Sequence, residues 1–140
     1  MARAFLKRTG RLLRACRVLP VAWRVRRLLR REANLPRLLS QLESGPVWPA
    51  AVDPAALHQD VKVALRLLGV RERGCVPRAM TLYALLSRQG RAATYVSGIR
   101  RLTGELDGHA WVEVNGVPVA EGNLAGITVQ FRHDSRRSVP

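Results

Sequence analysis

Two stretches decide the fold: GCVPRAMTLYALLSRQG at residues 74–90 and GHAWVEVNGVPVAE at residues 108–121. In the first, the apolar residues predict a helix over about 76–89, which the final glycine ends. The helix is apolar almost all round, which is typical of a central, buried position. In the second, Asn115-Gly116 between two apolar runs predicts a β-hairpin with a type I′ turn.

The rest of the C-terminal half also has the period of strands. Residues 93–99 predict one strand, a polar loop follows over 100–108, and 109–114 predict the next strand. Pro118 indicates an edge position for the arm after the turn, because proline donates no ladder hydrogen bond. A last strand is expected over 127–131.

Helices are expected before the sheet. Asp53 is a good N-cap for a helix that starts at Pro54, and Gly69 ends that helix. The preceding residues, 40–54, contain three prolines and a glycine and are expected to form a loop. Helices followed by a small antiparallel sheet are typical of an α+β domain.

The positive charge is concentrated at the N-terminus. The 140 residues have a net charge of +14, from 24 Lys and Arg and 10 Asp and Glu. Residues 1–37 hold 12 basic residues and one acid, Glu32, whereas 38–140 hold 12 basic and 9 acidic residues. We therefore expect a basic helical segment, 1–37, and a nearly balanced domain, 38–140. Because 47% of the residues are hydrophobic, wholesale disorder is excluded.

The basic segment has the period of a helix. One stripe has 4-3-4-3-4 spacing and comprises Phe5, Thr9, Leu12, Cys16, Leu19 and Trp23. Pro20 is expected to break or kink this helix, or to open a second one over 20–33, which Asn34 and Pro36 then end.

Four roles are open for this segment. It can pack its stripe on the domain and leave its charge in water, or bind a membrane surface, a nucleic acid, or a protein or peptide partner. No zinc-finger or basic-zipper spacing supports DNA binding. The longest uncharged apolar run, 18–23, is too short for a signal peptide or a membrane span. We therefore expect no nucleic-acid partner and no stable membrane insertion.

Cys75 is the candidate nucleophile. It opens the buried helix, where the helix dipole and unpaired N–H groups favour a thiolate and can stabilise an oxyanion. Cys16 is interpreted as a small buried hydrophobe. Without a secretory signal, both thiols are expected to be reduced.

His109 is the candidate general base, because it begins a strand next to that helix. A third group must accept its other N–H, and Glu121 at the end of the second hairpin arm is placed to do so. Glu113 shares the His109 face but lies about 13 Å along the strand, and Asp107 lies on the loop. The remaining histidines, at 58 and 133, are interpreted as surface or packing residues.

Cysteine, then histidine, then acid is the chain order of papain-like and transglutaminase-like enzymes. No pair of residues has metal-ligand spacing, and no glycine-rich loop is suited to a phosphate. We therefore expect no metal and no cofactor.

Residues 74–86, 96–100 and 108–116 closely resemble the transglutaminase-like leader peptidases of lasso-peptide biosynthesis, in the form without a fused recognition domain. That family has an Arg three residues after the Cys, a His-Ala-Trp-Val-Glu string, and an Asp twelve residues after the His. The resemblance implies that Cys75 is the nucleophile and His109 the base. Glu121 takes the third position, where the family usually has Asp.

The resemblance implies a cytoplasmic cysteine peptidase that cuts the leader from a ribosomally made precursor peptide. It also implies a separate leader-recognition protein and, later, an ATP-dependent macrolactam cyclase as partners. The basic segment is a candidate docking surface, through Arg24, Arg26, Arg27, Arg30 and Arg31. A transglutaminase-like thiol acyltransferase and a non-catalytic peptide-binding module are the alternatives.

Overall fold

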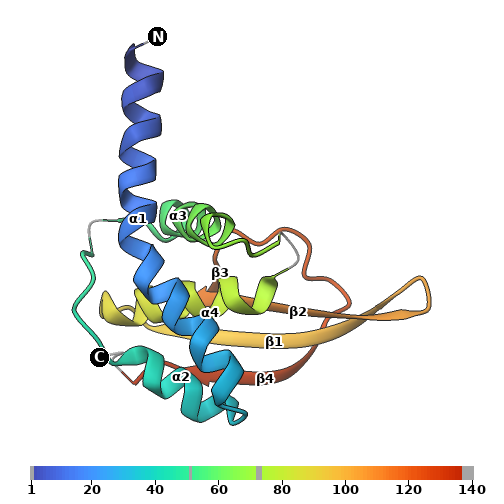
Figure 1. The fold of residues 1–140 in the computed structure, drawn as a ribbon. Coiled ribbons are helices and arrows are strands. Elements are labelled where there is room, and N and C mark those ends of the chain that lie inside the picture. Colours follow the sequence, from blue (N-terminus) through green and yellow to red (C-terminus); the bar gives the residue numbers. More distant parts are fainter. Residues whose placement is uncertain (1, 51, 72–73, 137–140) are drawn as a thin grey trace.

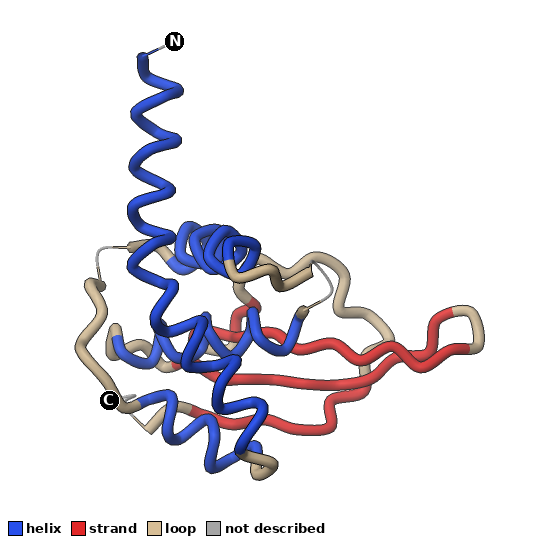
Figure 2. Tube along the Cα trace, viewed as in Figure 1, coloured by secondary structure: helices blue, strands red, loops and turns tan. Residues whose placement is uncertain are grey.

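The computed structural model describes residues 2–50, 52–71 and 74–136. Within this part of the chain, four helices precede a four-stranded antiparallel sheet, which confirms the expected α+β architecture (Figures 1 and 2). The elements are α1 (Ala2–Arg31), α2 (Leu35–Glu43), α3 (Pro54–Leu67), α4 (Cys75–Arg88), β1 (Ala93–Leu102), β2 (Glu105–Val114), β3 (Val117–Pro118) and β4 (Thr128–Asp134).

The strand order in the sheet is β3-β2-β1-β4. Asn115 and Gly116 join β2 to β3 with φ values of 52° and 78°, so the predicted type I′ hairpin is confirmed. Pro118 lies in the edge strand β3, as expected. The predicted loop over 100–108 is wrong, because β1 and β2 continue through it as a long hairpin that projects from the body (Figure 1).

α3 and α4 confirm the helices predicted from Pro54 to Gly69 and over about 76–89. The Asp53 carboxylate accepts hydrogen bonds from the N–H groups of Ala55 and Ala56 at 3.1 and 3.3 Å, so it caps α3. α4 contacts the other three helices as well as β1 and β2, and it lies between those helices and the sheet (Figure 1). Its residues 79–88 are all buried, which explains its apolar residues on every side.

α2 was not expected, and the loop predicted over 40–54 begins only after it, at Ser44. Asn34 and Pro36 do not end a helix but begin one: the Asn34 side chain accepts the N–H of Arg37 at 3.0 Å, and Pro36 lies in the first turn. Asn as N-cap followed by an early proline is a start signal, because neither needs a helical hydrogen bond there. Leu38, Leu39 and Leu42 then bury one face of α2.

α1 corrects two expectations about the basic segment. It is one helix through Pro20, with neither the break nor the second helix that we expected. The face packed on the body is Ala15, Val18, Ala22 and Val25, each 0% exposed, and not the 4-3-4-3-4 stripe. Fully burying a valine contributes about 1.5–3 kcal/mol, so these residues fasten α1 to the domain.

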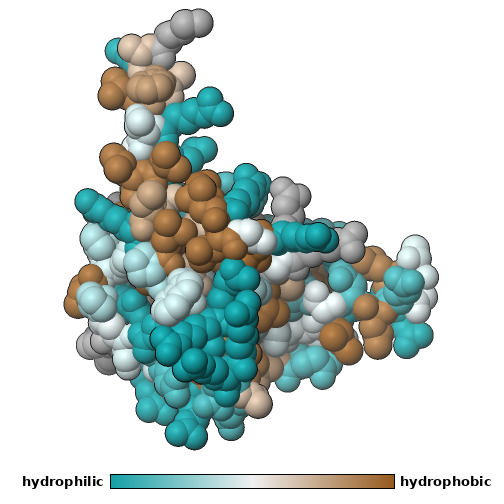
Figure 3. Space-filling view, viewed as in Figure 1, coloured by the Kyte–Doolittle hydropathy of each residue, from teal (hydrophilic) through white to brown (hydrophobic). Residues whose placement is uncertain are grey.

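The stripe that we singled out lies mainly on an exposed side of α1, although its member Leu19 packs partly buried against the core. Phe5, Leu12 and Trp23 are 71%, 49% and 54% exposed, and Cys16 is exposed rather than buried as expected. Figure 3 shows apolar side chains along the part of α1 that extends beyond the body. No helix in the described part of the chain is long and apolar enough to cross a membrane.

A buried polar network joins α2, α4 and β4. The Tyr83 hydroxyl donates to Glu43 Oε1 at 2.6 Å, and His133 Nε2 lies 3.4 Å from the same oxygen. Burial first, and the Glu43 carboxylate second, raises the pKa of Tyr83 well above its usual range. His133 is thus a packing residue, one of the two interpretations made for it.

Candidate active site

The three residues expected to carry chemistry come from three different segments. Cys75 is the first residue of α4, His109 lies within β2, and Glu121 follows β3. His109 Nε2 lies 2.8 Å from Glu121 Oε2, and the two side chains are 22% and 14% exposed. The longer side chain of glutamate, compared with aspartate, therefore reaches the imidazole.

The Cys75 thiol is partly exposed at the start of α4. Its Sγ lies 4.0 Å from the carbonyl oxygen of Gly108, the residue before His109. In the described ranges no hydrogen bond joins the thiol to His109 itself. Because Glu121 occupies Nε2 of the ring, Nδ1 is the nitrogen left to take a proton from sulfur.

The first turn of α4 has no side-chain cap. Gly74 is the N-cap residue, so no side chain accepts the N–H groups at this end. The Arg78 N–H donates to the Gly74 carbonyl at 3.2 Å, and Pro77 has no N–H. The N–H groups of Cys75 and Val76 therefore have no side-chain cap, at the positive end of the helix dipole where the thiol lies.

The sheet positions His109 through a close approach of three strands. His109 pairs with Gly98 in β1, and β4 passes Gly98 on the other side. A Cβ on Gly98 would lie only 2.6 Å from the carbonyl oxygen of Thr128, so only glycine allows β4 this near. Trp111 stacks on the His109 ring at 5.8 Å between centroids and restrains it from one side.

The β2–β3 hairpin positions Glu121. After the turn, the Val119 N–H donates to the carbonyl of Val112 at 2.9 Å, and Val119 is buried. This keeps the returning chain beside β2 for the two further residues that lead to Glu121. The Asn-Gly turn thus sets the spacing between His109 and its acid.

The two competing acids have other partners. Asp107 Oδ2 lies 3.5 Å from Arg100 Nε. Glu113 pairs with Arg132 and accepts the indole N–H of Trp111 at 3.3 Å. Neither is bonded to His109, so Glu121 is the acid that the structure brings to the imidazole.

His58, interpreted from the sequence as a surface or packing residue, lies buried near this site. It is 8% exposed, and it lines a small cavity together with Glu121, Arg78 and Trp111. Its Nδ1 is buried without a hydrogen-bond partner. Burial first, then Arg78 and Lys62, lowers the pKa of His58, while Glu121 opposes the shift. The available signal was helical spacing, since His58 is three residues before the core residue Val61.

Tyr95 lies under the same end of α4. It is 1% exposed, and burial first, with Cys75 second, raises the pKa of Tyr95 to about 12. Its phenol is therefore neutral across the physiological range and adds no charge near the sulfur.

The five arginines expected to bind partners divide into two groups. Arg24 donates to the carbonyls of Ser44 and Gln41, and Arg26 donates to the carbonyl of Leu68 at 2.8 Å. These two fasten α1 to the ends of α2 and α3. The other three, Arg27, Arg30 and Arg31, are exposed, and with Trp23 and Arg26 they line a depression of about 350 Å³.

Residues 2–50, 52–71 and 74–136 contain no group of three or more His, Cys, Asp or Glu side chains arranged to hold a metal ion. Neither curated proteins nor solved structures gave a significant match to the chain. A family model described as the transglutaminase-like superfamily matches residues 15–132, from the first buried residue of α1 to β4. Cysteine peptidases and acyltransferases both belong to this superfamily. With its thiol at the start of a buried helix and a His–acid pair on the adjoining sheet, the chain belongs to the transglutaminase-like superfamily.

Proposed function

We propose that the protein is a cysteine peptidase that removes the leader from a ribosomally made lasso-peptide precursor. The single observation that carries the peptidase chemistry is the 2.8 Å contact of His109 with Glu121, beside the Cys75 thiol at an uncapped helix start. The lasso-peptide substrate rests on the resemblance of residues 74–86, 96–100 and 108–116 to that family.

The first half-reaction forms a thioester. Glu121 accepts the Nε2–H of His109, so Nδ1 takes the thiol proton of Cys75 as sulfur attacks the scissile carbonyl carbon. The N–H groups of Cys75 and Val76 stabilise the oxyanion. The intermediate collapses with cleavage of the C–N bond, and the imidazolium returns its proton to the leaving amine.

The second half-reaction hydrolyses the thioester. Water attacks the acyl carbon while Nδ1 of His109 takes its proton, and the C–S bond breaks to release the carboxylic acid and the Cys75 thiol. An acyltransferase follows the same path with an amine in place of water. The two activities therefore differ in the acceptor and share the site.

Mass analysis of the products separates these outcomes. The full chain is incubated with a leader–core peptide and the separate recognition protein, with and without a primary amine. Two fragments whose masses sum to the peptide plus water support the peptidase. An amine adduct of the acyl fragment, or of the intact peptide with loss of ammonia from a Gln side chain, would instead support the acyltransferase.

Cys75→Ala should abolish cleavage, and Cys16→Ala is its matched control, since both thiols are accessible in the same chain. An inactive Cys16→Ala with an active Cys75→Ala would overturn the assignment of the nucleophile. If the pathway proceeds unchanged with Cys75→Ala, the protein is a non-catalytic binding module.

We also propose that the basic depression on α1 docks the recognition protein with its bound leader. Arg27, Arg30 and Arg31 present exposed charge there, and Arg27 lies 5.4 Å over the exposed Trp23 ring. Reversing these three arginines to Glu should weaken association with the recognition protein and leave alkylation of Cys75 unchanged. Reversing Arg3, Lys7 and Arg8 on the same helix is the matched control for net charge, and an equal loss there would refute a local docking site.

A further inference from the structure

A small cavity lies beside the His109–Glu121 pair. It has a volume of about 10 Å³, which is room for one water molecule. Its polar walls are His58 from α3, Arg78 from α4 and Glu121 from the chain after β3. The other walls are apolar or aromatic and include Trp111, which stacks on the His109 ring. One water in this space can contact both His58 and Glu121, because the cavity is no larger than that.

Glu121 has one carboxylate oxygen without a partner in the protein. Its Oε2 lies 2.8 Å from His109 Nε2. Among residues 2–50, 52–71 and 74–136, no group donates a hydrogen bond to its Oε1. The terminal torsion of a glutamate side chain has broad minima, so a donor to the second oxygen would fix the plane of the carboxylate. Such a donor would hold the acid in the orientation that His109 needs.

The two ring nitrogens of His58 differ in their surroundings. Nδ1 is buried without a hydrogen-bond partner in the described part of the chain, whereas Nε2 is not enclosed in this way. A neutral imidazole carries one N–H, and buried polar groups in proteins are rarely left without a partner. We therefore place the proton on Nε2, where it can reach an acceptor, and the lone pair on Nδ1.

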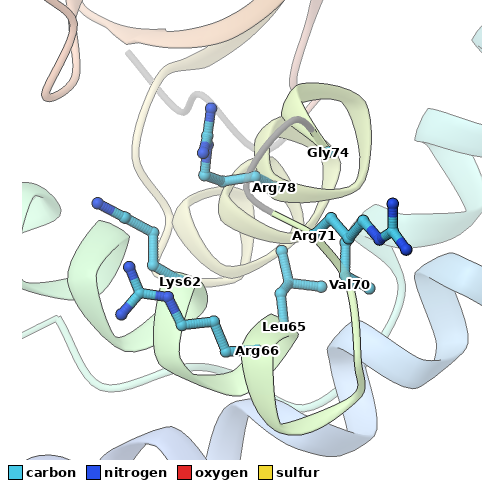
Figure 4. Close-up of a pocket in the computed structure, with 7 residues that line it drawn as sticks. All are labelled: Lys62, Leu65, Arg66, Val70, Arg71, Gly74 and Arg78. Carbon is cyan, nitrogen blue, oxygen red and sulfur yellow. The ribbon is translucent and has the colours of Figure 1, made fainter.

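The surroundings of His58 keep its imidazole neutral. It is 8% exposed, and Lys62 follows it by one turn of α3. Figure 4 shows the side chains of Lys62 and Arg78 extending to the same side of a neighbouring pocket. Burial first, then Arg78 and Lys62, lowers the pKa of His58, although Glu121 opposes the shift. A neutral His58 can donate a hydrogen bond without adding a second positive charge beside Glu121.

We propose that His58 is a positioning residue for Glu121. The Nε2–H of His58 donates to one water bound in the cavity, and that water donates to Glu121 Oε1. Glu121 is thereby held with Oε2 toward the Nε2–H of His109, and His109 with Nδ1 toward Cys75. The inference rests on the proposed peptidase function and adds a fourth residue to its site.

Two amide substitutions test which nitrogen of His58 acts. Glutamine carries its amide nitrogen at the position of Nε2, and asparagine carries it at that of Nδ1. In cleavage of the leader–core peptide by the full chain with the recognition protein, His58→Gln should keep kcat within about threefold. His58→Asn and His58→Leu should lower kcat by about tenfold with KM unchanged, because a hydrogen bond to a charged group is lost. Equal kcat in all three variants would overturn the proposal.

A destabilised variant of the same helix controls for damage to the fold. Val61→Ala removes both γ-methyl groups of a residue that is 0% exposed and does not line the cavity. It should lower the free energy of unfolding in urea and leave kcat unchanged. A tenfold loss of kcat in Val61→Ala would show that the effect of His58 is one of stability, and it would overturn a positioning role.

A double-mutant cycle tests whether His58 acts through Glu121. In a chain that already carries Glu121→Ala, the further change His58→Leu should alter kcat less than about twofold, because the group to be positioned is gone. A full tenfold loss in that background would overturn the proposal, since His58 would then act on another group.

Alkylation of Cys75 separates failure of this proposal from failure of the peptidase function. Iodoacetamide reacts with the thiolate, so its rate at pH 7 reports proton transfer from Cys75 to His109. Every chain carries Cys16→Ala, which leaves one cysteine to label. We expect His58→Asn and His58→Leu to slow labelling severalfold and His58→Gln to preserve it, even if no peptide is cleaved. Equal labelling rates in all variants would overturn the positioning role, whereas the expected rates without cleavage would overturn only the peptidase.

Discussion

The N-termini of α3 and α4 are built differently. α3 begins at Pro54 behind Asp53, whose carboxylate satisfies two of the first N–H groups. α4 begins at Cys75 behind Gly74, and no side chain caps it. In two helices of the same length, the first backbone N–H groups are thus capped by a side chain in α3 and left without a side-chain cap in α4.

We expect the α3 cap to contribute to folding stability and the uncapped start of α4 to contribute to catalysis. A capped helix start is worth about 0.5–2 kcal/mol to the fold, and α3 keeps that stabilisation. α4 lacks that stabilisation, and we expect its first N–H groups to be available for a developing oxyanion. Burial of residues 79–88 holds α4 in place instead, so its first turn does not need the cap.

The largest expected effect is on the His–acid pair beside the α4 start. His109→Gln should abolish turnover, and Glu121→Ala should reduce kcat by about 10²–10⁴-fold, because the imidazole loses the group that orients it. Glu121→Asp should preserve or improve activity. Single-turnover cleavage measures all three. Strong activity in Glu121→Ala would move the third role to another residue.

Exchanging the caps tests the comparison directly. Gly74→Asp places a carboxylate where it can accept the N–H groups of α4, so we expect kcat to fall by about 10²–10³-fold. Gly74→Ala is the control, since any Cβ there would lie 2.8 Å from Val70 Cγ1. Equal activity of the Asp and Ala variants would show that these donors do not take part.

The corresponding change in α3 should affect stability alone. Asp53→Ala removes the cap, and we expect the free energy of unfolding to fall by about 1 kcal/mol. Urea denaturation measures this loss, and kcat measured well below the unfolding range should stay the same. A fall in kcat without loss of stability would contradict the separation drawn here.

At acidic pH, protonation of His58 in α3 should lower the free energy of unfolding. The pKa of His58 is lowered in the folded protein, so between that value and about 6.5 the unfolded chain binds more protons. The contribution of neutral His58 to the free energy of unfolding is complete above pH 6.5, and it is lost as the pH falls through the lowered pKa. His58→Gln should make the free energy of unfolding less dependent on pH between 7 and 5, as urea titrations at several pH values will show.

At alkaline pH, ionisation of Tyr95 in β1 should lower the free energy of unfolding. Burial raises the pKa of Tyr95 from 10.0 to about 12, so between these values the folded chain keeps a proton that the unfolded chain has released. The free energy of unfolding therefore falls as the pH rises from 10 to 12. Tyr95→Phe should flatten this fall, and an unchanged slope would contradict it.

Local signals explain what the sequence could predict. Asp53-Pro54 and Asn115-Gly116 define their helix start and turn through backbone geometry, which needs no distant partner. The choice of Cys75, His109 and Glu121 combined such local signals with chain order and a family resemblance. The close approach of β4 at Gly98 gave no signal, because it depends on a strand about 30 residues away.

The errors came from features with two interpretations. In α1, the stripe that includes Phe5 and Trp23 and the face that includes Ala15 and Val25 are both apolar at helical spacing. Packing against α3 and α4 decides which of the two is buried. Asn34 can end one helix or begin the next. The position of His58 beside the site gave no signal apart from helical spacing, since Glu121, with which it lines a cavity, lies more than 60 residues later.

The buried face of α1 sets how far the chain can be shortened. Residues 2–13 leave the body without a core contact, whereas Arg14 donates to the buried Asp60 carboxylate at 3.2 Å. A chain that starts near residue 14 should therefore keep its fold while losing four of its positive charges. Deletion to residue 37, where the charge changes, would instead remove Val18, Ala22 and Val25 and open the core above α4. The distribution of charge is therefore a poor guide to truncation, and the first buried residue is a good one.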